Sequence, residues 1–251
     1  LLGLITPSSG SARMFGLPVP SQRARARIGF LPENPYVFPQ LTPREFVEMS
    51  GALSGMRGRK LHQRTEQVLD RTGVLYAADR QVRRLSKGML QRSALAAALV
   101  ADPEMLILDE PMSGLDPVGR KEVRDLILAE REAGRTIFFS SHILSDVETL
   151  CDHVTILRRG SVVVSGPLRS LLKTDVIHTD ILCEEGEGDL VAELVAAGYS
   201  PERRGSLVLI AVRGQAAVSA VLRIALAAQA NVVEVAPRRE TLEDLFMRRA
   251  L

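Results

Sequence analysis

The sequence contains little cysteine, few aromatic residues and no long hydrophobic run. Its only cysteines, Cys151 and Cys183, exclude a disulfide scaffold and suit a reducing compartment. No stretch approaches the roughly 18 consecutive apolar residues of a membrane-spanning helix. No positively charged segment followed by an apolar one opens the chain. We therefore expect neither a membrane anchor nor a secretory leader within these residues.

A strong excess of either charge is also lacking. Lys and Arg together number 32 and Asp and Glu 30, so the net charge is +2, which excludes nucleic-acid binding by bulk charge. The alternating arginines of Arg23–Arg27 have no aromatic residue between them for base stacking, and we interpret them as a charged edge strand. Because His62, His153 and His178 lie in no Cys/His cluster, we expect no zinc site.

The first two thirds of the chain alternate between apolar strands and helices, which predicts an α/β fold with a parallel sheet. Strands are predicted at 28–31, 105–108, 136–139 and 153–158, the last followed by a hairpin turn. The signature Thr42-Pro43-Arg44-Glu45 predicts the start of a helix with a capping box. Further helices are predicted at 59–72, from Ser86 to about 101, from Asp116 to about 132, and at 143–151. We interpret the helical stretch at about 42–101 as a lobe inserted in the sheet domain.

The character of the sequence changes after Gly166-Pro167, so we place a domain boundary between residues 166 and 167. The remaining residues, 167–251, predict a small accessory α+β domain. Its strands are expected at 176–183, 207–212 and 231–236, and its helices at 188–197, 216–228 and 241–249.

Two acidic residues, Asp109 and Glu110, follow the apolar run Met105–Leu108. Ligands of α/β sheets bind at the carboxyl ends of the strands, where these acids lie. Adjacent strand residues point to opposite faces, so the two carboxylates can have different partners, such as a magnesium ion and a water molecule. By itself the pattern fits a plain polar strand end equally well.

Three more segments carry polar residues next to the end of a predicted helix or strand. Ser86 begins a helix, and Gly88 in its first turn lets a ligand come close to the backbone, where free amides favour an anion. A tight loop, Ser113–Asp116, follows the two acids, and His142 follows the next strand. Taken alone, Ser86 is more often a simple N-cap and His142 a structural histidine.

The order of these segments closely resembles the ATP-binding-cassette (ABC) ATPases. Leu85–Met89 resembles their signature motif, Met105–Glu110 their Walker B strand, Ser113–Asp116 their D-loop, and His142 their switch histidine. Phe30–Glu33 lies at the Q-loop position. The resemblance covers residues 1 to about 166. It implies a P-loop NTPase-type nucleotide-binding domain with ATP and Mg²⁺ as its cofactors.

The resemblance also implies a role for each site residue. Asp109 would hold Mg²⁺, Glu110 would act as general base toward the hydrolytic water, and His142 would contact the γ-phosphate. Two copies would enclose two nucleotides between them, each copy binding the other's ATP through its signature motif. The implied nucleotide-binding residues are Ser86, Gly88, Met89, Glu33 and Asp116, and Asp116 would couple the two sites.

The chain departs from the family pattern in three places. Glu33 stands where the family has Gln, which keeps an acceptor and loses the amide donor. In the signature, Lys87 replaces a small residue, and Met89 replaces Gln as in the branch that resembles drug and antibiotic exporters. The segments Val235–Pro237 and Thr241–Phe246 also resemble the C-terminal extension of that branch.

The third departure concerns the P-loop, or Walker A motif, which needs Gly-Lys followed by Ser or Thr. No Gly-Lys pair occurs in the sequence, whose four lysines follow Arg59, Ser86, Arg120 and Leu172. Leu1–Ile5 looks like the end of a helix, so we expect an N-terminally truncated cassette whose P-loop lies upstream of Leu1. We expect the full-length parent to be an ATPase, and residues 1–251 alone to be inactive.

Three functional hypotheses follow. The first is the ATPase subunit of an ABC exporter, working as a dimer, with a homodimer expected, on separate polytopic permease subunits at the cytoplasmic face of the membrane. The second is a soluble, non-transport cassette acting on ribosomes or DNA. Such relatives tend to carry two cassettes or a long coiled coil, which this chain lacks, and we expect no nucleic-acid partner. The third is a non-enzymatic fragment.

Overall fold

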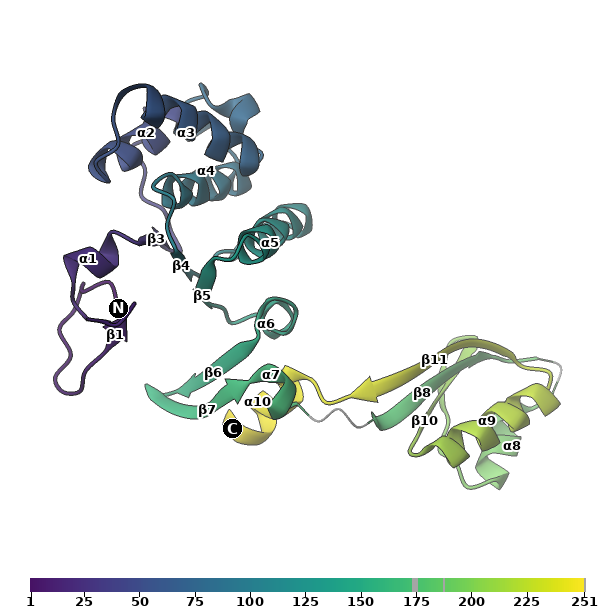
Figure 1. Cartoon of the computed structure of the whole chain (residues 1–251). Helices are drawn as coiled ribbons and strands as arrows, with labels where there is room; N and C mark the ends of the chain where they lie inside the picture. Colours follow the sequence, from purple (N-terminus) through teal and green to yellow (C-terminus); the bar gives the residue numbers. More distant parts are fainter. Residues whose placement is uncertain (173–175, 187, 251) are drawn as a thin grey trace. The chain divides into compact units, whose positions relative to one another are not determined.

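The computed structural model describes residues 1–172, 176–186 and 188–250. Contacts divide the chain into two compact units, Leu1–Leu150 and Cys151–Leu251. In Figure 1 the first unit runs from purple to teal and the second from green to yellow. This division lies earlier in the chain than the domain boundary that we placed between residues 166 and 167. The predicted domain boundary stays a prediction. Among the described residues no helix is long and apolar enough to cross a membrane.

The start of the chain differs from our expectations in two respects. Leu1–Ile5 forms no helix: the chain bends at Gly3–Ile5, and Gly3 has a φ of 79°, which lies outside the right-handed helical region. The arginine-rich stretch is no edge strand: its first residues form the short helix α1, Gln22–Arg25, capped by the Ser21 side chain, which accepts a hydrogen bond from the Ala24 N–H. A small hairpin precedes it, formed by β1, Arg13–Met14, and β2, Leu17–Pro18.

A three-stranded parallel sheet forms the centre of the first unit. Its order is β3-β4-β5, from Ile28–Leu31, Met105–Asp109 and Thr136–Ser140. One face, with Leu31, Leu106 and Leu108, is buried in the main hydrophobic core. On the other face Phe30 and Phe138 remain 39% and 54% exposed. The predicted parallel sheet is therefore present, and the structure covers one face more fully than the other.

The helical lobe lies between β3 and β4 in the sequence, as predicted. It comprises α2, Pro43–Leu53; α3, Gly58–Arg71; two short 3₁₀ turns, Leu75–Ala77 and Val82–Arg84; and α4, Lys87–Leu99. The capping box at the start of α2 is confirmed: the Thr42 side chain accepts from the Glu45 N–H, and the Glu45 carboxylate accepts from the Thr42 N–H. In Figure 1 α2, α3 and α4 pack together beside the sheet strands.

Gly29 lets the lobe approach the sheet closely. A side chain at this position of β3 would collide with the carbonyl oxygen of Ala98 in α4 and with the side chain of Leu106 in β4. Because glycine has no Cβ, the backbone of β3 lies directly against α4. This contact joins the helix that begins at Ser86 to the strand that precedes Glu33.

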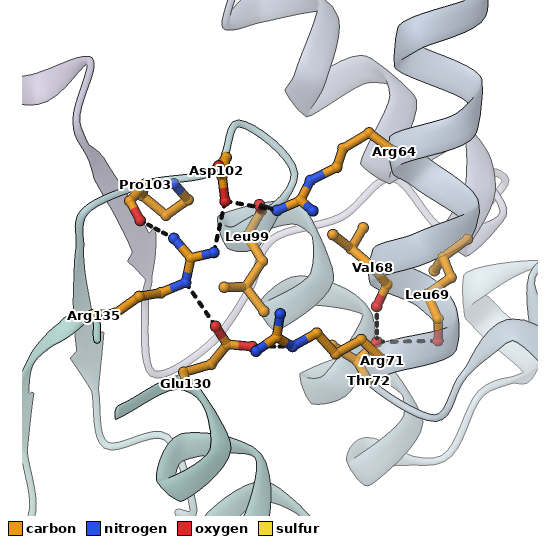
Figure 2. A network of polar contacts seen from close by, with 10 residues as sticks. All are labelled: Arg64, Val68, Leu69, Arg71, Thr72, Leu99, Asp102, Pro103, Glu130 and Arg135. Atoms are coloured by element: carbon orange, nitrogen blue, oxygen red, sulfur yellow. Dashed lines mark hydrogen bonds and ion pairs between the residues drawn. The ribbon is translucent and has the colours of Figure 1, made fainter. Parts of the chain in front are cut away.

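An ion-pair network centred on the buried Glu130 also ties the lobe to the sheet domain (Figure 2). The Glu130 carboxylate, at the end of α5, is fully buried and lies 2.6 Å from Arg71 Nε of α3 and 2.7 Å from Arg135 Nε. Arg135 also reaches Asp102, at 2.6 Å, and Arg64 of α3 reaches the same carboxylate at 3.0 Å. The hydrogen bond from Arg135, together with the nearby positive charges, holds the pKa of Asp102 below its ordinary value, although partial burial opposes this.

Two helices complete the first unit. The longer one, α5, spans Pro117–Glu132 as predicted, with Asp116 as its N-cap and Pro117 in its first turn. The shorter one, α6, spans Leu144–Leu150. A partly buried ion pair of 2.8 Å joins Arg120 of α5 to Asp146 of α6. This pair fixes α6 directly after the segment that carries His142.

The second unit begins with an antiparallel hairpin. Its strands are β6, His153–Arg158, and β7, Ser161–Pro167, followed by the single turn α7, Leu168–Leu171. The last helix of the chain, α10, Leu242–Ala250, contacts both strands of the hairpin. Because β6 and β7 pair in antiparallel orientation on either side of it, the predicted hairpin turn at Arg159–Ser161 is confirmed.

The rest of this unit is a four-stranded antiparallel sheet in the order β11-β8-β10-β9, with the connection pattern βαββαβ. Its strands are β8, Val176–Glu184; β9, Glu202–Arg204; β10, Leu207–Val212; and β11, Asn231–Arg239. The two helices α8, Leu190–Ala196, and α9, Gln215–Ala227, enclose a separate hydrophobic core against the sheet. The expected α+β unit is present, with β9 as an additional strand.

Candidate functional site

The two acids lie at the carboxyl end of β4, the middle strand of the parallel sheet. Leu106 and Leu108 anchor the strand in the core, and Asp109, its last residue, is exposed. Glu110 follows with only a fifth of its side chain accessible. The burial of the strand therefore brings one open and one half-enclosed carboxylate to the edge where α/β sheets bind ligands.

A serine that our sequence analysis did not single out holds both acids. Ser140 ends β5, and the parallel register pairs it with Asp109. Its hydroxyl donates to Asp109 Oδ1 at 2.6 Å and accepts from the backbone N–H of Glu110 at 3.0 Å. The sequence shows a polar residue at the end of an apolar strand. Only the pairing of β4 with β5 reveals what that residue touches.

Glu110 has an uncommon backbone conformation. Its φ of 45° lies in the left-handed region that residues with a Cβ rarely adopt. A tight turn follows, in which the Ser113 N–H donates to the Glu110 carbonyl at 3.0 Å. Such strain is common at functional sites, and here it turns the Glu110 side chain away from the line of the strand.

The carboxylate of Glu110 contacts the candidate switch histidine. Its Oε2 lies 2.9 Å from Nδ1 of His142, whose ring remains largely exposed. The structure thus brings together Asp109, Glu110 and His142, three of the residues that the resemblance assigns to the chemistry. Their catalytic roles stay predictions.

The N-terminus of α4 offers a second polar surface. The Ser86 hydroxyl accepts from the Met89 N–H at 3.2 Å, so it acts as the N-cap, and its own O–H is left to donate. Apart from the neighbouring residues and the backbone of α4 itself, no heavy atom of the described residues lies within 4 Å of the position that a Cβ at Gly88 would take, so the backbone there is open to a ligand. The Met89 side chain is buried and its N–H donates to the Ser86 hydroxyl, and its predicted role at the nucleotide stays a prediction.

Two contacts connect α4 to the loop that follows the acids. The buried side-chain amide of Gln91 donates to the Pro111 carbonyl at 2.9 Å. The Lys87 side chain covers Gly114, whose φ of 65° favours glycine, and its ammonium lies where a Cβ at position 114 would be. Sequence analysis did not single out Gln91. A polar residue in an alanine-rich helix is expected on the helix surface, so the sequence did not indicate a buried contact.

The remaining predicted site residues lie in loops of the same unit. Asp116 accepts from the Gly119 N–H at 2.7 Å and so caps α5, and its side chain is otherwise exposed. Glu33 is exposed in the loop after β3. Neither residue contacts the two acids through any interaction that the structure records for the described part of the chain.

The oxygen ligands near Asp109 could fill only part of the coordination shell of Mg²⁺. Within the described residues, no group of three or more His, Cys, Asp or Glu side chains could hold a metal by itself. Mg²⁺ is commonly bound by one or two carboxylates together with phosphate oxygens and water. Because Ser140 occupies only one oxygen of Asp109, the other can take such a place. A magnesium ion therefore fits this site when it arrives with a phosphate group.

Comparisons with known proteins find similar sequences over much of the chain. A family profile described as ABC transporter matches residues 1–113. The chain is 48% identical over 174 residues to an ABC transporter ATP-binding protein of Nostoc sp., covering 68% of this chain and 52% of that protein. It is 32% identical to the Nod factor export ATP-binding protein I of Cupriavidus metallidurans, covering 99% of this chain and 81% of that protein.

The fold is also similar to a solved structure, described as the ATP-binding subunit of an ABC transporter. The TM-score is 0.60 at 26% identity, covering 68% of this chain and 72% of the other. The chain therefore spans about half of the Nostoc relative and most of the Cupriavidus relative. Sequence and fold comparisons point to one family.

Proposed function

This chain belongs to the family of ABC transporter ATP-binding proteins, and from that premise we propose that it is the nucleotide-binding part of an export system whose permease subunits are separate chains. The observation that carries the proposal is the arrangement at the end of β4. An exposed carboxylate, a half-enclosed carboxylate and an imidazole lie side by side, held by the strand end of β5.

Each residue of this arrangement takes one role. Asp109 holds Mg²⁺, whose positive charge offsets the negative charge of the phosphates. Glu110 accepts a proton from the attacking water, and His142, in contact with Glu110, orients this carboxylate and donates to the γ-phosphate. The half-enclosure of Glu110 supports its assignment as base, because a water held there is partly withdrawn from bulk solvent.

A second ATP-binding subunit completes the site. The signature residues Ser86 and Gly88, with Met89 behind them, bind the γ-phosphate of the ATP held by that subunit, and Asp116 couples the two sites. The free O–H of Ser86 and the open backbone at Gly88 support this role, because both can approach an anion at the start of α4. Glu33, which is exposed in the loop after β3, would offer an acceptor carboxylate to the nucleotide site. We expect the second subunit to be another copy of the same chain.

Residues 1–251 do not hydrolyse ATP on their own in this proposal. A P-loop supplies backbone amides and a lysine to the β- and γ-phosphates, and the sequence contains no Gly-Lys pair that could do so. The test is phosphate release from the purified 1–251 polypeptide, with Glu110→Gln as its matched control. We expect equal background rates. Activity in the first that is lost in the second would overturn this part of the proposal.

The permease would dock beside the loop that carries Glu33. An apolar groove there runs between β3, α2 and α4, lined among others by Phe30, Pro32, Tyr36, Leu53, Ala97 and Ala101. Tyr36 and Leu53 are strongly exposed at this groove. Such a contact would hold the protein at the cytoplasmic face of the membrane.

Site-directed crosslinking tests this contact. Cysteine at the exposed position Leu53 should crosslink in whole cells to a protein with several membrane spans, whereas cysteine at the exposed Leu226 of the second unit should not. A crosslink from position 53 to ribosomal protein or to DNA-bound protein would instead favour a non-transport cassette. Because the two variants differ only in the position of the introduced cysteine, nonspecific crosslinking would occur in both.

A further inference from the structure

Ser140 forms hydrogen bonds with both acidic residues of the site. Its hydroxyl donates to Asp109 Oδ1 and accepts from the Glu110 N–H, at 2.6 and 3.0 Å. No other side-chain hydrogen bond to Asp109 occurs in the part of the chain that the structure describes. A single hydroxyl therefore determines how this carboxylate is turned.

The chemistry of the hydroxyl explains why a serine suits this position. A hydroxyl has one donor and two acceptor lone pairs, so it can bind a carboxylate and an amide at the same time. Alanine would lose both bonds, whereas threonine would keep the hydroxyl on the same Cβ. Each bond has a distinct effect, because one orients a side chain and the other holds a backbone.

The backbone bond acts on a strained residue. Glu110 has a positive φ, which a residue with a Cβ adopts only when its surroundings hold it there. The bond from its N–H to Ser140 is one such restraint, and the Ser113 N–H bond to its carbonyl is another. If the first were lost, the Glu110 carboxylate would be freer to leave His142.

We propose that Ser140 is a positioning residue that orients Asp109 toward the metal and holds Glu110 in the conformation that presents its carboxylate to water. This inference rests on the proposed function, in which Asp109 binds Mg²⁺. The end of β5 then serves both acids: Ser140 holds the first, and His142, two residues later, contacts the second. In this role Ser140 acts through the two acids, which it contacts directly.

Manganese titration of the full 251-residue chain tests the proposal without using catalysis. Mn²⁺ replaces Mg²⁺ at oxygen sites and broadens nearby NMR signals, so the backbone amides of Asp109 and Glu110 report its binding when MnCl₂ is titrated in the presence of ATP, which supplies the phosphate oxygens. We expect the half-saturating Mn²⁺ concentration to rise about 10-fold in Ser140→Ala and to stay within about 3-fold of wild type in Ser140→Thr. Amide hydrogen exchange at Glu110, measured without metal, should accelerate in the alanine variant only.

Ser145→Ala, at an exposed position of α6, is the matched control and should behave as wild type. Equal Mn²⁺ affinities in wild type and Ser140→Ala would overturn the positioning role while leaving the metal site intact. Failure of Mn²⁺ to broaden these signals even in wild type would overturn the metal role of Asp109, and this inference with it. Loss of affinity in both Ser140 variants would contradict the role of the hydroxyl.

Discussion

At the scale of single residues, several side chains of the site hold the fold and also face a ligand. Asp116 is the clearest case, because it caps α5 through the Gly119 N–H and is also the residue proposed to couple the two ATP sites. Ser86 combines a cap on α4 with an open hydroxyl in the same way. Loss of activity after substitution of such a residue says nothing about its role unless stability is measured separately.

Substitution of Asp116 can separate the two effects. Asp116→Ala removes the cap and should lower the free energy of unfolding by about 1 kcal/mol. Asp116→Asn keeps an oxygen acceptor for the Gly119 N–H and should stay within about 0.5 kcal/mol of wild type. Urea unfolding followed by circular dichroism measures both. Equal destabilisation by the two variants would show that the negative charge, and not the cap, stabilises α5.

At the scale of elements, the ion-pair network at Glu130 fixes the lobe against the sheet domain. Three segments meet there: α3 supplies Arg71, the last turn of α5 supplies the buried Glu130 carboxylate, and Arg135 lies just before β5. Because α4 runs directly into β4 through Asp102, the same network holds the connection between the signature helix and the strand of acids.

Removing the central charge of this network should therefore be costly. In Glu130→Gln two guanidinium groups lose a fully buried carboxylate, and we expect the free energy of unfolding to fall by about 3 kcal/mol. Glu132→Gln, at an exposed position of the same helix, is the control and should change it by less than about 0.5 kcal/mol. Denaturant unfolding of both variants measures the difference. A change in Glu130→Gln no larger than the control's would mean that the buried pairs merely offset their own desolvation.

Elements with strong local signals could be predicted from the sequence. The capping box at Thr42 and the Asp116-Pro117 start placed α2 and α5 correctly, because these signals act within one helical turn. The three-residue strand β9, with the sequence Glu-Arg-Arg, has no apolar alternation, and only its pairing with β10 makes it a strand. Arg23–Arg25 became helical because Ser21 could cap them.

The site was predictable in its residue types and less so in its contacts. Asp109, Glu110 and His142 were singled out because the order of their segments along the chain resembles that of the ABC ATPase motifs. Ser140 and Gln91 matter through partners that are 31 and 20 residues away, and no local pattern indicates such pairs. Which strand lies next to which is decided by packing of the whole sheet, and this information is spread over the chain.

At the scale of the whole molecule, each of the two units has its own main hydrophobic core. One is built from β3–β5 and the helices of the first unit, and the other from β8, β10, α8 and α9. Residues of each core pack among themselves within their own unit. The two units should therefore lose structure independently when one core is damaged.

Hydrogen exchange followed by mass spectrometry can show this independence. Leu194→Ala opens a cavity in the second core, where the side chain is fully buried, and should destabilise that unit by about 2–5 kcal/mol. Peptides from β8 and β10 should then lose protection while peptides from β4 and α5 keep theirs. Leu106→Ala, in the first core, should give the reverse pattern. Loss of protection in both units from either substitution would show that the chain unfolds as one body.

The incompletely covered sheet of the first unit affects how this polypeptide behaves at high concentration. Phe30 and Phe138 present aromatic surface to solvent, and β5 ends the sheet with backbone groups that have no neighbouring strand in the described part of the chain. Exposed apolar surfaces and unpaired strand edges of this kind promote self-association of the protein. Steep ligand-binding curves recorded at millimolar protein concentration would then reflect aggregation rather than cooperative binding. Each binding measurement should therefore be repeated at several protein concentrations.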